Sequence, residues 1–384
     1  MKLAVPKERR ATEARVAATP ETVRQLIGLG LTVAVESGAG VASGFPDAAY
    51  REAGAEIAPD TAAVLAGAGI VFKVRAPLTA GEGEVDELAL IPDGAMLVGM
   101  LEAFAVTERA AAYALKRLTA CSMELLPRIT RAQSMDVLSS QANLAGYRAV
   151  IEGAAAFDRG FPMLMTAAGT IAPANVLVLG AGVAGLQAIA TARRLGGRVS
   201  ASDVRPAAKE EIRSLGASFV GVEDEESAAA QTTGGYAKAL SETYLRKQAE
   251  VVAVAAAKAD IVVCTALVQG RRAPVLLSEA MVASMKPGSV VVDIASDAGG
   301  NCAATVPGEM ITTANGVKVL GWRNWAARIP SSASSLYARN LLTFLSTFWD
   351  WDAGAPKLPE GDEIVHGVLL TQGGAVVHPQ LRSA

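Results

Sequence analysis

Short apolar runs alternate with amphipathic helical patterns along most of the chain, and this alternation predicts an α/β fold. In the first third, strands are predicted at 2–5, 32–35, 70–73 and 96–98, and helices at 20–29, 47–53 and 107–115. The first of these helices has both start signals, because Thr19 can cap it and Pro20 occupies its first position. The pattern is that of a doubly wound, mostly parallel sheet.

The same alternation resumes after a long helical segment at 134–157. Further strands are predicted at 176–179, 198–202, 219–222, 261–265, 290–294 and 318–320, with a helix at 335–347 and a loop at 350–363. Strand-like runs at 367–370 and 375–377 are expected to return to the first domain. We therefore expect two doubly wound, Rossmann-like domains with mostly parallel sheets, joined by long helices. The expected bounds are 1–133 plus about 330–384 for the N-terminal domain, 134–164 for a linking helix, and 165–329 for a Rossmann domain.

One uncharged stretch is long enough to cross a bilayer, since the 33 residues from 160 to 192 carry no charge. Pro162, Gly169, Pro173 and Asn175 interrupt it. A buried central strand followed by the packed face of a helix explains these breaks better than a spanning helix does.

Composition narrows the class of protein. Apolar residues make up 51% and charged residues 19%, and the net charge of −3 provides no basic stripe for nucleic acid. Cys121, Cys264 and Cys302 suggest neither a disulfide framework nor a metal site, so we predict that they are core residues. The N-terminus becomes charged before a signal segment could form, which favours a cytoplasmic protein.

The candidate chemistry centres on a glycine turn. The apolar run at 176–179 leads into Gly180-Ala181-Gly182-Val183-Ala184-Gly185, and a helical pattern follows. In such a unit Gly180 permits the tight turn, Gly182 lets the backbone approach a pyrophosphate, and Gly185 lets the helix pack on the strand. The phosphates then bind the unpaired N–H groups at the helix N-terminus.

An acidic residue selects the nucleotide. Asp203 closes the run at 198–202, 18 residues past Gly185, where its carboxylate can accept hydrogen bonds from an adenosine ribose and would repel a 2′-phosphate. The unit therefore predicts an NAD(H) site. Arg205 leaves NADP(H) open, because its guanidinium could pair with that phosphate.

A second glycine run imitates this fingerprint. Gly38-Ala39-Gly40-Val41-Ala42-Ser43 also follows a predicted strand, but Gly44-Phe45-Pro46 comes next. A helix N-terminus is then not available for a pyrophosphate, so we predict a loop.

A polar stripe lies on the helical segment between the two halves. Asp136, Ser139 or Ser140, Asn143 and Tyr147 recur at helical spacing, so they share one face. Small amide and hydroxyl groups suit a neutral carboxamide and ribose hydroxyls, although a merely solvated face has the same periodicity.

Over nearly its whole length the sequence resembles the soluble NAD(H)-binding alpha subunit (domain I) of the proton-translocating NAD(P) transhydrogenases, which are related to the alanine dehydrogenases. The segments that carry the resemblance are 1–20, 73–74, 123–148, 180–188, 234–238, 285–289, 298–302 and 338–342. The Arg128–Asn143 motif is the specific one, because alanine dehydrogenases do not carry it.

The resemblance implies roles for individual residues. Those that would hold the nicotinamide end and serve catalysis are Arg128, Gln133, Asp136 and Ser139, and Gln133 would also help to place the two nucleotides. The implied cofactor contacts are Gly180, Gly182, Val183, Gly185, Asp203, Val204, Arg205, Gly235, Tyr236 and Leu267. Gly234, Gly235 and Tyr236 would belong to a loop that closes over the nucleotide; a plain surface loop is the alternative.

The resemblance also implies an assembly. The chain would form a homodimer and act with an NADP(H)-binding beta subunit and a membrane-spanning alpha-2 subunit, on the inner face of the bacterial cytoplasmic membrane. It would be a detachable subunit of a Re/Si-specific transhydrogenase, in which hydride passes from bound NADH to NADP⁺ on the partner while protons move inward. No metal is expected.

The histidines help to decide between reactions. A dehydrogenase for alcohols or amines must also move a proton, usually with His or Lys, yet the only histidines are His366 and His378 in the tail. Hydride transfer between two nicotinamide rings needs no acid or base at the reacting carbons, so transhydrogenation is favoured.

Two alternatives remain open. One is an alanine-dehydrogenase-like oxidoreductase: the chain shares Arg15 and Lys73 with that pattern, and Asp297 and Asn324 also fit it. The pattern's substrate lysine is replaced by Arg75, however, and its catalytic histidine by Met100. The other is a non-catalytic NAD(H)-binding regulatory module. Four tryptophans remain without a predicted role beyond domain packing or partner contact, namely Trp322, Trp325, Trp349 and Trp351.

Overall fold

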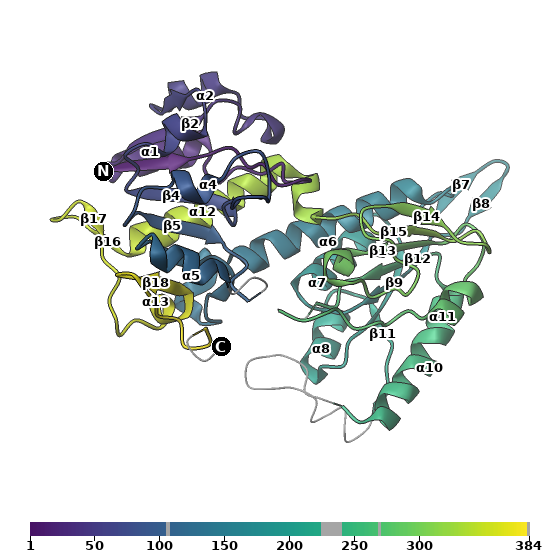
Figure 1. Ribbon diagram of the computed structural model, residues 1–384. Helices are drawn as coiled ribbons and strands as arrows, with labels where there is room; N and C mark the ends of the chain where they lie inside the picture. Colours follow the sequence, from purple (N-terminus) through teal and green to yellow (C-terminus); the bar gives the residue numbers. More distant parts are fainter. Residues whose placement is uncertain (105–107, 224–239, 268–269, 382–384) are drawn as a thin grey trace. The chain divides into compact units, whose positions relative to one another are not determined.

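The computed structural model describes residues 1–104, 108–223, 240–267 and 270–381, and it divides into two compact units (Figure 1). Unit 1 comprises Met1–Gln141 and Ala327–Ala384, and unit 2 comprises Ala142–Ala326. Each unit is built on a mostly parallel sheet with helices, so the predicted α/β class is confirmed.

Unit 1 contains an eight-stranded sheet in the order β19-β18-β6-β5-β4-β1-β2-β3. The strands are β1 (Lys2–Val5), β2 (Thr32–Glu36), β3 (Glu56–Ala58), β4 (Ile70–Arg75), β5 (Met96–Met100), β6 (Thr119–Ser122), β18 (Leu369–Gln372) and β19 (Ala375–Val376). Strand β1 pairs in parallel with both β2 and β4, so the winding reverses direction there. Among these eight described strands, β18 and β19 alone run antiparallel to their neighbours.

The first helix of unit 1 begins at its expected cap. The helices described in this unit are α1 (Pro20–Gly28), α2 (Asp47–Glu52), α3 (Thr61–Leu65), α4 (Glu87–Leu90), α5 (Glu108–Leu115), α12 (Pro330–Thr347) and α13 (Glu363–Val368). The hydroxyl of Thr19 accepts a hydrogen bond from the N–H of Thr22, as predicted for α1. The second glycine run leads only into the three-residue 3₁₀ helix Val41–Ser43, so it provides no helix for a phosphate.

One strand prediction for unit 1 needs correction, and two strands were missed. Residues 367–370 do not form one strand: α13, which Asp362 caps through the N–H groups of Ile364 and Val365, runs to Val368, and β18 starts at Leu369. Strand β18 lies beside β6, which places the tail in this unit's sheet. Strands β3 and β6 were not predicted.

Unit 2 contains a seven-stranded sheet in the order β11-β10-β9-β12-β13-β15-β14. The strands are β9 (Asn175–Leu179), β10 (Arg198–Ser202), β11 (Ser218–Phe219), β12 (Ile261–Cys264), β13 (Val290–Asp293), β14 (Met310–Thr312) and β15 (Lys318–Leu320). Its helices include α7 (Val183–Arg194), α8 (Pro206–Ser214), α10 (Glu242–Lys258) and α11 (Glu279–Ser284). Of the strands described in this sheet, β14 is the one that is antiparallel to its neighbour.

Strand β9 explains the uncharged stretch. Val176 and Val178 belong to the apolar cluster on one face of the sheet, and Leu177 and Leu179 to the cluster on the other. A strand buried on both faces reads as a continuous apolar run. Among the described residues no helix is long and apolar enough to cross a membrane.

The connection between the two units differs from the predicted linking helix 134–164. Residues Thr130–Met135 form a 3₁₀ helix, and α6 runs from Val137 to Ala156. Helix α6 begins at Val137 because the carboxylate of Asp136 accepts the N–H of Ser139, which is an N-terminal cap. The uncharged segment continues as the unpredicted hairpin β7 (Leu164–Thr166) and β8 (Gly169–Ile171), whose strand residues are all exposed (Figure 1).

The three cysteines are unpaired and buried, as predicted. Burial raises the pKa of the Cys121 thiol to about 12 and that of Cys302 to about 11. The pKa of Cys264 is also raised well above its usual value, first by burial and then by the nearby charge of Asp293.

The tryptophans have separate environments. Trp325 is buried in unit 2, and its indole N–H donates to the carbonyl of Asp293 at 3.1 Å. Trp349 is buried in the core of unit 1, in the short ribbon β16 (Trp349–Asp350) and β17 (Ala355–Pro356). Trp322 packs against the core of unit 2, whereas Trp351 is 68% exposed. Three of the four therefore contribute to packing.

Candidate functional site

The glycine fingerprint forms a turn between β9 and α7. Strand β9 ends at Leu179, Gly180 has a φ of 98°, and α7 begins at Val183 with Gly182 as its N-cap. A φ of that sign strains any residue with a Cβ, so Gly180 is required by the turn itself. The first N–H groups of α7 lack intrahelical partners and can bind an anion.

The other two glycines have different surroundings. A Cβ on Gly185 would lie 1.9 Å from the carbonyl oxygen of Gly180, which no side chain tolerates. A Cβ on Gly182 would meet nothing within 4 Å. Packing of the helix on the strand therefore requires Gly185, whereas Gly182 faces open space, as a residue that a pyrophosphate approaches should. On the other side of α7, a Cβ on Gly146 would lie 2.0 Å from the carbonyl oxygen of Ala184, so α6 also packs closely there.

Asp203 follows β10 and is tied to this turn. Its Oδ2 atom accepts the N–H of Ala181 at 2.7 Å. The guanidinium of Arg205 donates to both carboxylate oxygens at 2.9 Å, and its backbone N–H donates to Oδ1 at 2.8 Å. Arg205 therefore pairs with the acid that the sequence assigns to the ribose, and the adjoining Val204 is half-buried.

Two exposed apolar side chains occur at the same edge of the sheet. Val183 is 40% exposed at the start of α7, and Leu267 is 51% exposed three residues past the end of β12. The carboxyl ends of parallel strands meet at one edge, so both side chains belong to the edge that carries the fingerprint. They offer apolar surface to a flat ring.

Residues that the sequence patterns did not reveal form hydrogen bonds at the end of β12, next to the glycine turn. The hydroxyl of Thr265 donates to the carbonyl of Gly180 at 2.9 Å. The side-chain amide of Asn301 binds both the N–H and the C=O of Ala266, and Asp293 accepts the N–H of Asn301. The one available signal was the matching segment 298–302, which contains Asn301.

The predicted nicotinamide residues lie in unit 1. Arg128 and Gln133 are exposed, and Asp136 and Ser139 are half-buried. The structure joins the last two: Ser139 donates to Asp136 from its N–H at 2.9 Å and from its hydroxyl at 2.6 Å. Asp136 thus already has a structural role as the cap of α6.

The residues of the predicted polar face contact different elements in the structure. The hydroxyl of Ser140 donates to Oδ1 of Asn340 on α12 at 2.8 Å. In unit 2, the amide of Asn143 donates to Gln187 at 3.2 Å, and Tyr147 is 40% exposed. Gly234, Gly235 and Tyr236 lie outside the described residues.

The cations of the alanine-dehydrogenase pattern are paired within unit 1. The ammonium of Lys73, 1% exposed, lies 3.3 Å from Glu8 and 3.0 Å from Glu87. Arg15 pairs with Glu13 at 2.7 Å and donates to Gln141 at 2.8 Å.

The remaining positions of that pattern are also engaged. Arg75 forms an ion pair with Glu102, and Met100 donates its N–H to Tyr337 at 3.2 Å. In unit 2, Asp297 accepts the N–H of Asn324 at 2.8 Å. Arg75 and Asp297 therefore have partners within the chain, although Nε of Arg75 is buried without a hydrogen bond to any described residue.

The histidines belong to the tail of unit 1. His366 lies on α13 and His378 follows β19, where it is 7% exposed. Burial lowers the pKa of His378. Among the described residues, no group of three His, Cys, Asp or Glu side chains could hold a metal ion.

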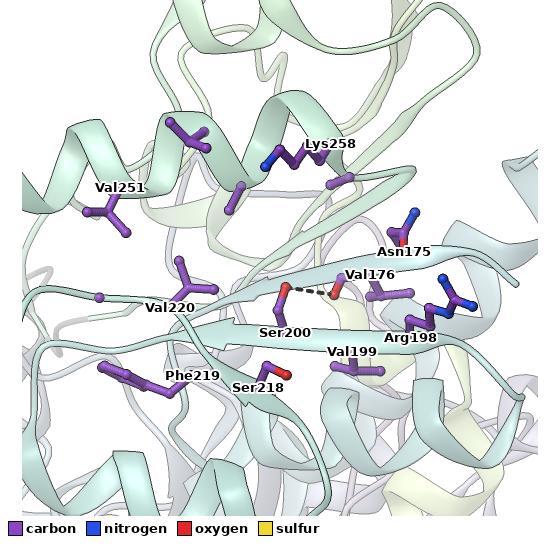
Figure 2. A pocket seen from close by; sticks show the side chains of 14 residues that line it. Asn175, Val176, Arg198, Val199, Ser200, Ser218, Phe219, Val220, Val251 and Lys258 are labelled. Atoms are coloured by element: carbon purple, nitrogen blue, oxygen red, sulfur yellow. Dashed lines mark hydrogen bonds between the residues drawn. The ribbon is translucent and has the colours of Figure 1, made fainter.

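A groove of 510 Å³ in unit 2 runs between α10 and the sheet (Figure 2). Asn175 and Arg198, the first residues of β9 and β10, line one end, and Phe219, Val220 and Val251 line the other. The fingerprint follows the last residue of β9, so the groove is distinct from the predicted nucleotide site.

The family models for the alanine dehydrogenase/PNT N-terminal and C-terminal domains match residues 4–145 and 149–379. The chain belongs to the alanine dehydrogenase/PNT family. It is 53% identical, over 99% of both chains, to an NAD(P) transhydrogenase alpha-subunit chain of Rhodospirillum rubrum. Its fold matches a transhydrogenase from Sinorhizobium meliloti with a TM-score of 0.87, at 48% identity over 98% of this chain and 100% of the other. It also matches an L-alanine dehydrogenase with a TM-score of 0.80, at 26% identity over 100% and 98%. The sequence resemblance to the transhydrogenase branch is thereby confirmed.

Proposed function

We propose that the chain is the NAD(H)-binding component of a proton-translocating NAD(P) transhydrogenase, and that it presents NADH for direct hydride transfer to NADP⁺ on a partner subunit. The carrying observation is the glycine turn of unit 2, which combines the positive φ of Gly180, the open space at Gly182 and the anchored Asp203. The 53% identity to a transhydrogenase alpha subunit over 99% of the chain supports the proposal further.

The residues of unit 2 would bind the nucleotide. The first N–H groups of α7 suit the pyrophosphate, and Gly182 leaves room for it. Asp203 suits the adenosine ribose, with Arg205 sharing the carboxylate, and Val204 belongs to the same turn. Val183 and Leu267 offer apolar contact. This arrangement favours NAD(H), because the carboxylate would repel a 2′-phosphate.

The residues of unit 1 would hold the nicotinamide end. Gln133 offers an amide, Arg128 a cation, and the Asp136–Ser139 pair a carboxylate and a hydroxyl. The transferred hydride carries both electrons, so NADH becomes NAD⁺ while NADP⁺ becomes NADPH, and neither carbon exchanges a proton. Catalysis then requires placement of the two rings and exclusion of water rather than acid–base chemistry.

An alanine-dehydrogenase activity has less support. The cations that would hold a substrate carboxylate, Arg15 and Lys73, are buried and paired with glutamates of the chain. Releasing them would leave buried charges uncompensated, which costs several kcal/mol.

We further propose a homodimer that works with an NADP(H)-binding beta subunit and a membrane-spanning alpha-2 subunit, at the inner face of the cytoplasmic membrane. The hairpin β7–β8 supports self-association, since Met163, Leu164, Met165 and Ile171 are 58%, 41%, 76% and 44% exposed. A two-stranded hairpin is marginally stable alone, and an apolar one needs a covering surface.

The function is tested by hydride exchange. Adding the purified chain to an NADP(H)-binding transhydrogenase component should strongly stimulate hydride exchange between the nucleotides. In Gln133→Leu that rate should fall about tenfold while the Kd for NADH changes less than about threefold. The matched control is Gln25→Leu, an exposed glutamine on α1 that should leave both unchanged.

Three outcomes would overturn the proposal: no stimulation, reductive amination of pyruvate by the chain alone, or an effect of Gln133→Leu on NADH affinity but none on hydride exchange. The last result would instead favour the regulatory module.

Nucleotide preference gives a second prediction. Asp203→Asn should weaken NADH binding about tenfold and strengthen NADPH binding, because the guanidinium of Arg205 loses its charged partner and can pair with a 2′-phosphate. Fluorescence titration with both nucleotides measures this. Glu210→Gln on α8, at an exposed carboxylate, is the control. A tighter affinity of the unchanged chain for NADPH than for NADH would contradict the role given to Asp203.

A further inference from the structure

The backbone of Ala266, just past the end of β12, is held by a single side chain. Oδ1 of Asn301 accepts the N–H of Ala266 at 2.9 Å, and Nδ2 of Asn301 donates to the carbonyl of Ala266 at 2.9 Å. The second hydrogen on Nδ2 goes to the carbonyl of Pro274 at 2.7 Å. Asn301 is fully buried, so its amide is committed to these three backbone groups.

Asn301 is itself anchored to a central strand. Asp293, the last residue of β13, accepts the N–H of Asn301 at 2.8 Å, that of Cys302 at 3.0 Å, and the hydroxyl of Thr305 at 2.6 Å. Asp293 is also fully buried. The position of the Asn301 amide is therefore fixed by the end of β13, which does not belong to the fingerprint.

Ala266 lies between Thr265, which contacts the glycine turn, and Leu267, which belongs to the proposed nucleotide site. On one side, the hydroxyl of Thr265 donates to the carbonyl of Gly180 in the glycine turn. On the other side, Leu267 is exposed. Hydrogen bonds hold both the N–H and the C=O of Ala266. The directions of the neighbouring residues, Thr265 and Leu267, are therefore fixed as well.

The segment lies on a definite side of the fingerprint. Asp203, at the end of β10, marks the adenosine side, and β12 flanks β9 on the opposite side. A dinucleotide spans the point where the winding reverses, with one half on each side. Leu267 therefore belongs to the side that receives the nicotinamide half.

We propose that Asn301 is a positioning residue for the nicotinamide half of the nucleotide site. It acts through Ala266, sets the direction of Leu267, and is in turn held by Asp293. This inference rests on the proposed NAD(H) site.

The test compares two nucleotides on one variant. Asn301→Asp keeps the size of the side chain but replaces both Nδ2 donors with an oxygen that faces the carbonyls of Ala266 and Pro274. We expect the Kd for NADH to rise about tenfold, as for loss of a buried hydrogen-bonded group, while the Kd for AMP changes less than about twofold. Isothermal titration of the full chain measures both.

Asn315→Asp is the matched control. Nδ2 of Asn315 also donates to backbone carbonyls in unit 2, those of Val282 at 3.0 Å and Ala283 at 3.2 Å, but it precedes β15 and so lies at the amino end of the strands. Neither Kd should change in this variant.

Thr305→Val provides a milder change if Asn301→Asp does not fold. It removes one hydrogen bond from Asp293 and should raise the Kd for NADH about threefold, again with little change for AMP.

Equal weakening of NADH and AMP, or no change in either, in a folded variant would overturn the positioning role. If the unchanged chain bound AMP but not NADH, the proposed NAD(H) function itself would fail, and that result does not depend on Asn301.

Discussion

The strands of the two units' sheets are connected in the same way, but different residues follow the carboxyl ends of those strands. In unit 1 the first strand, β1, pairs in parallel with β2 and β4, which are the second and fourth strands along the chain. In unit 2 the first strand of the sheet, β9, pairs in parallel with β10 and β12, which are again the second and fourth. Such a reversal point is where open α/β sheets bind ligands. In unit 2 the first strand is followed by Gly180 and an open helix N-terminus. In unit 1 it is followed by Pro6, which has no N–H to offer a phosphate.

Charged side chains occupy the edge of unit 1 instead. Lys73 on β4 lies between Glu8 and Glu87, and all three are at least 90% buried. At the edge of unit 2 the glycine turn is supported by an uncharged contact, from the hydroxyl of Thr265 to the carbonyl of Gly180, and the ion pair of Asp203 with Arg205 lies beside that turn. Both sheets have the reversal point, but in unit 2 a glycine turn and the N–H groups of a helix N-terminus follow the first strand, and these groups can bind a phosphate.

The largest expected effect is loss of the buried charge in unit 1. Lys73→Met should lower the free energy of unfolding by about 3–5 kcal/mol, because it leaves two buried carboxylates without their cation. If the two edges work independently, NADH affinity of the folded variant should stay within about threefold. Urea unfolding and NADH titration measure the two effects.

Lys116→Met is the control for that variant. Lys116 pairs with the exposed Asp93 at 3.0 Å, and such a pair contributes at most about 1 kcal/mol. A folded Lys73→Met chain that no longer binds NADH would break the separation between the edges.

The second prediction separates packing from binding within unit 2. Gly185→Ala should cost about 1–3 kcal/mol of unfolding free energy and also abolish tight NADH binding, since its Cβ would clash with the carbonyl of Gly180. Gly182→Ala should leave stability within about 0.5 kcal/mol and weaken NADH about tenfold. Thermal unfolding with NADH titration distinguishes them. If Gly182→Ala bound NADH normally, the pyrophosphate would not lie at this turn.

The smallest expected effect is the pH dependence of stability that comes from the ion pairs of Glu102 in unit 1. Burial raises the pKa of the Glu102 carboxyl, but the charges of Arg75 and Arg109 and the hydrogen bonds from them outweigh it, so the pKa lies below 4.5. A lowered pKa contributes stability above the unfolded value that is lost as pH falls through the folded value. Glu102→Gln should therefore be about 1 kcal/mol less stable at pH 7, with the difference shrinking below pH 4.5.

Urea unfolding at about pH 7 and about pH 4 measures this difference, with the exposed Glu84→Gln as the control. A difference that stays constant with pH would contradict the ion-pair interpretation.

The sequence predicted the two strands beside the glycine turn well. The run at 176–179 is a strand because a strand buried on both faces is continuously apolar, and the run at 198–202 is a strand although Arg198 is exposed. Short strands with mixed patterns were missed, such as β3 and β6, and the predicted strand 219–222 is reduced to Ser218–Phe219. The start of α6 was placed three residues early, because a cap at Asp136 looks like a member of the polar helical face.

The residues of the candidate site also differ in whether the sequence could predict them. Gly180 and Asp203 could be assigned because one strand–turn–helix unit holds most of their chemistry in consecutive residues. Asn301, Asp293 and Ala266 come from three segments that meet only after β12 and β13 pair, so periodicity cannot reveal them. The residues of unit 1 at 128–139 were recognised by resemblance, and their roles remain predictions.

The buried cysteines have a practical consequence. Cys121 reports on unit 1, and Cys264 and Cys302 report on unit 2. A buried thiol with a raised pKa reacts with alkylating reagents only when its surroundings open, because the thiolate is the reactive form. Without any engineered label, the rate at which each cysteine is alkylated therefore records how often its own unit opens, and added NADH should slow the alkylation of Cys264, which pairs with Leu179 just before the glycine turn.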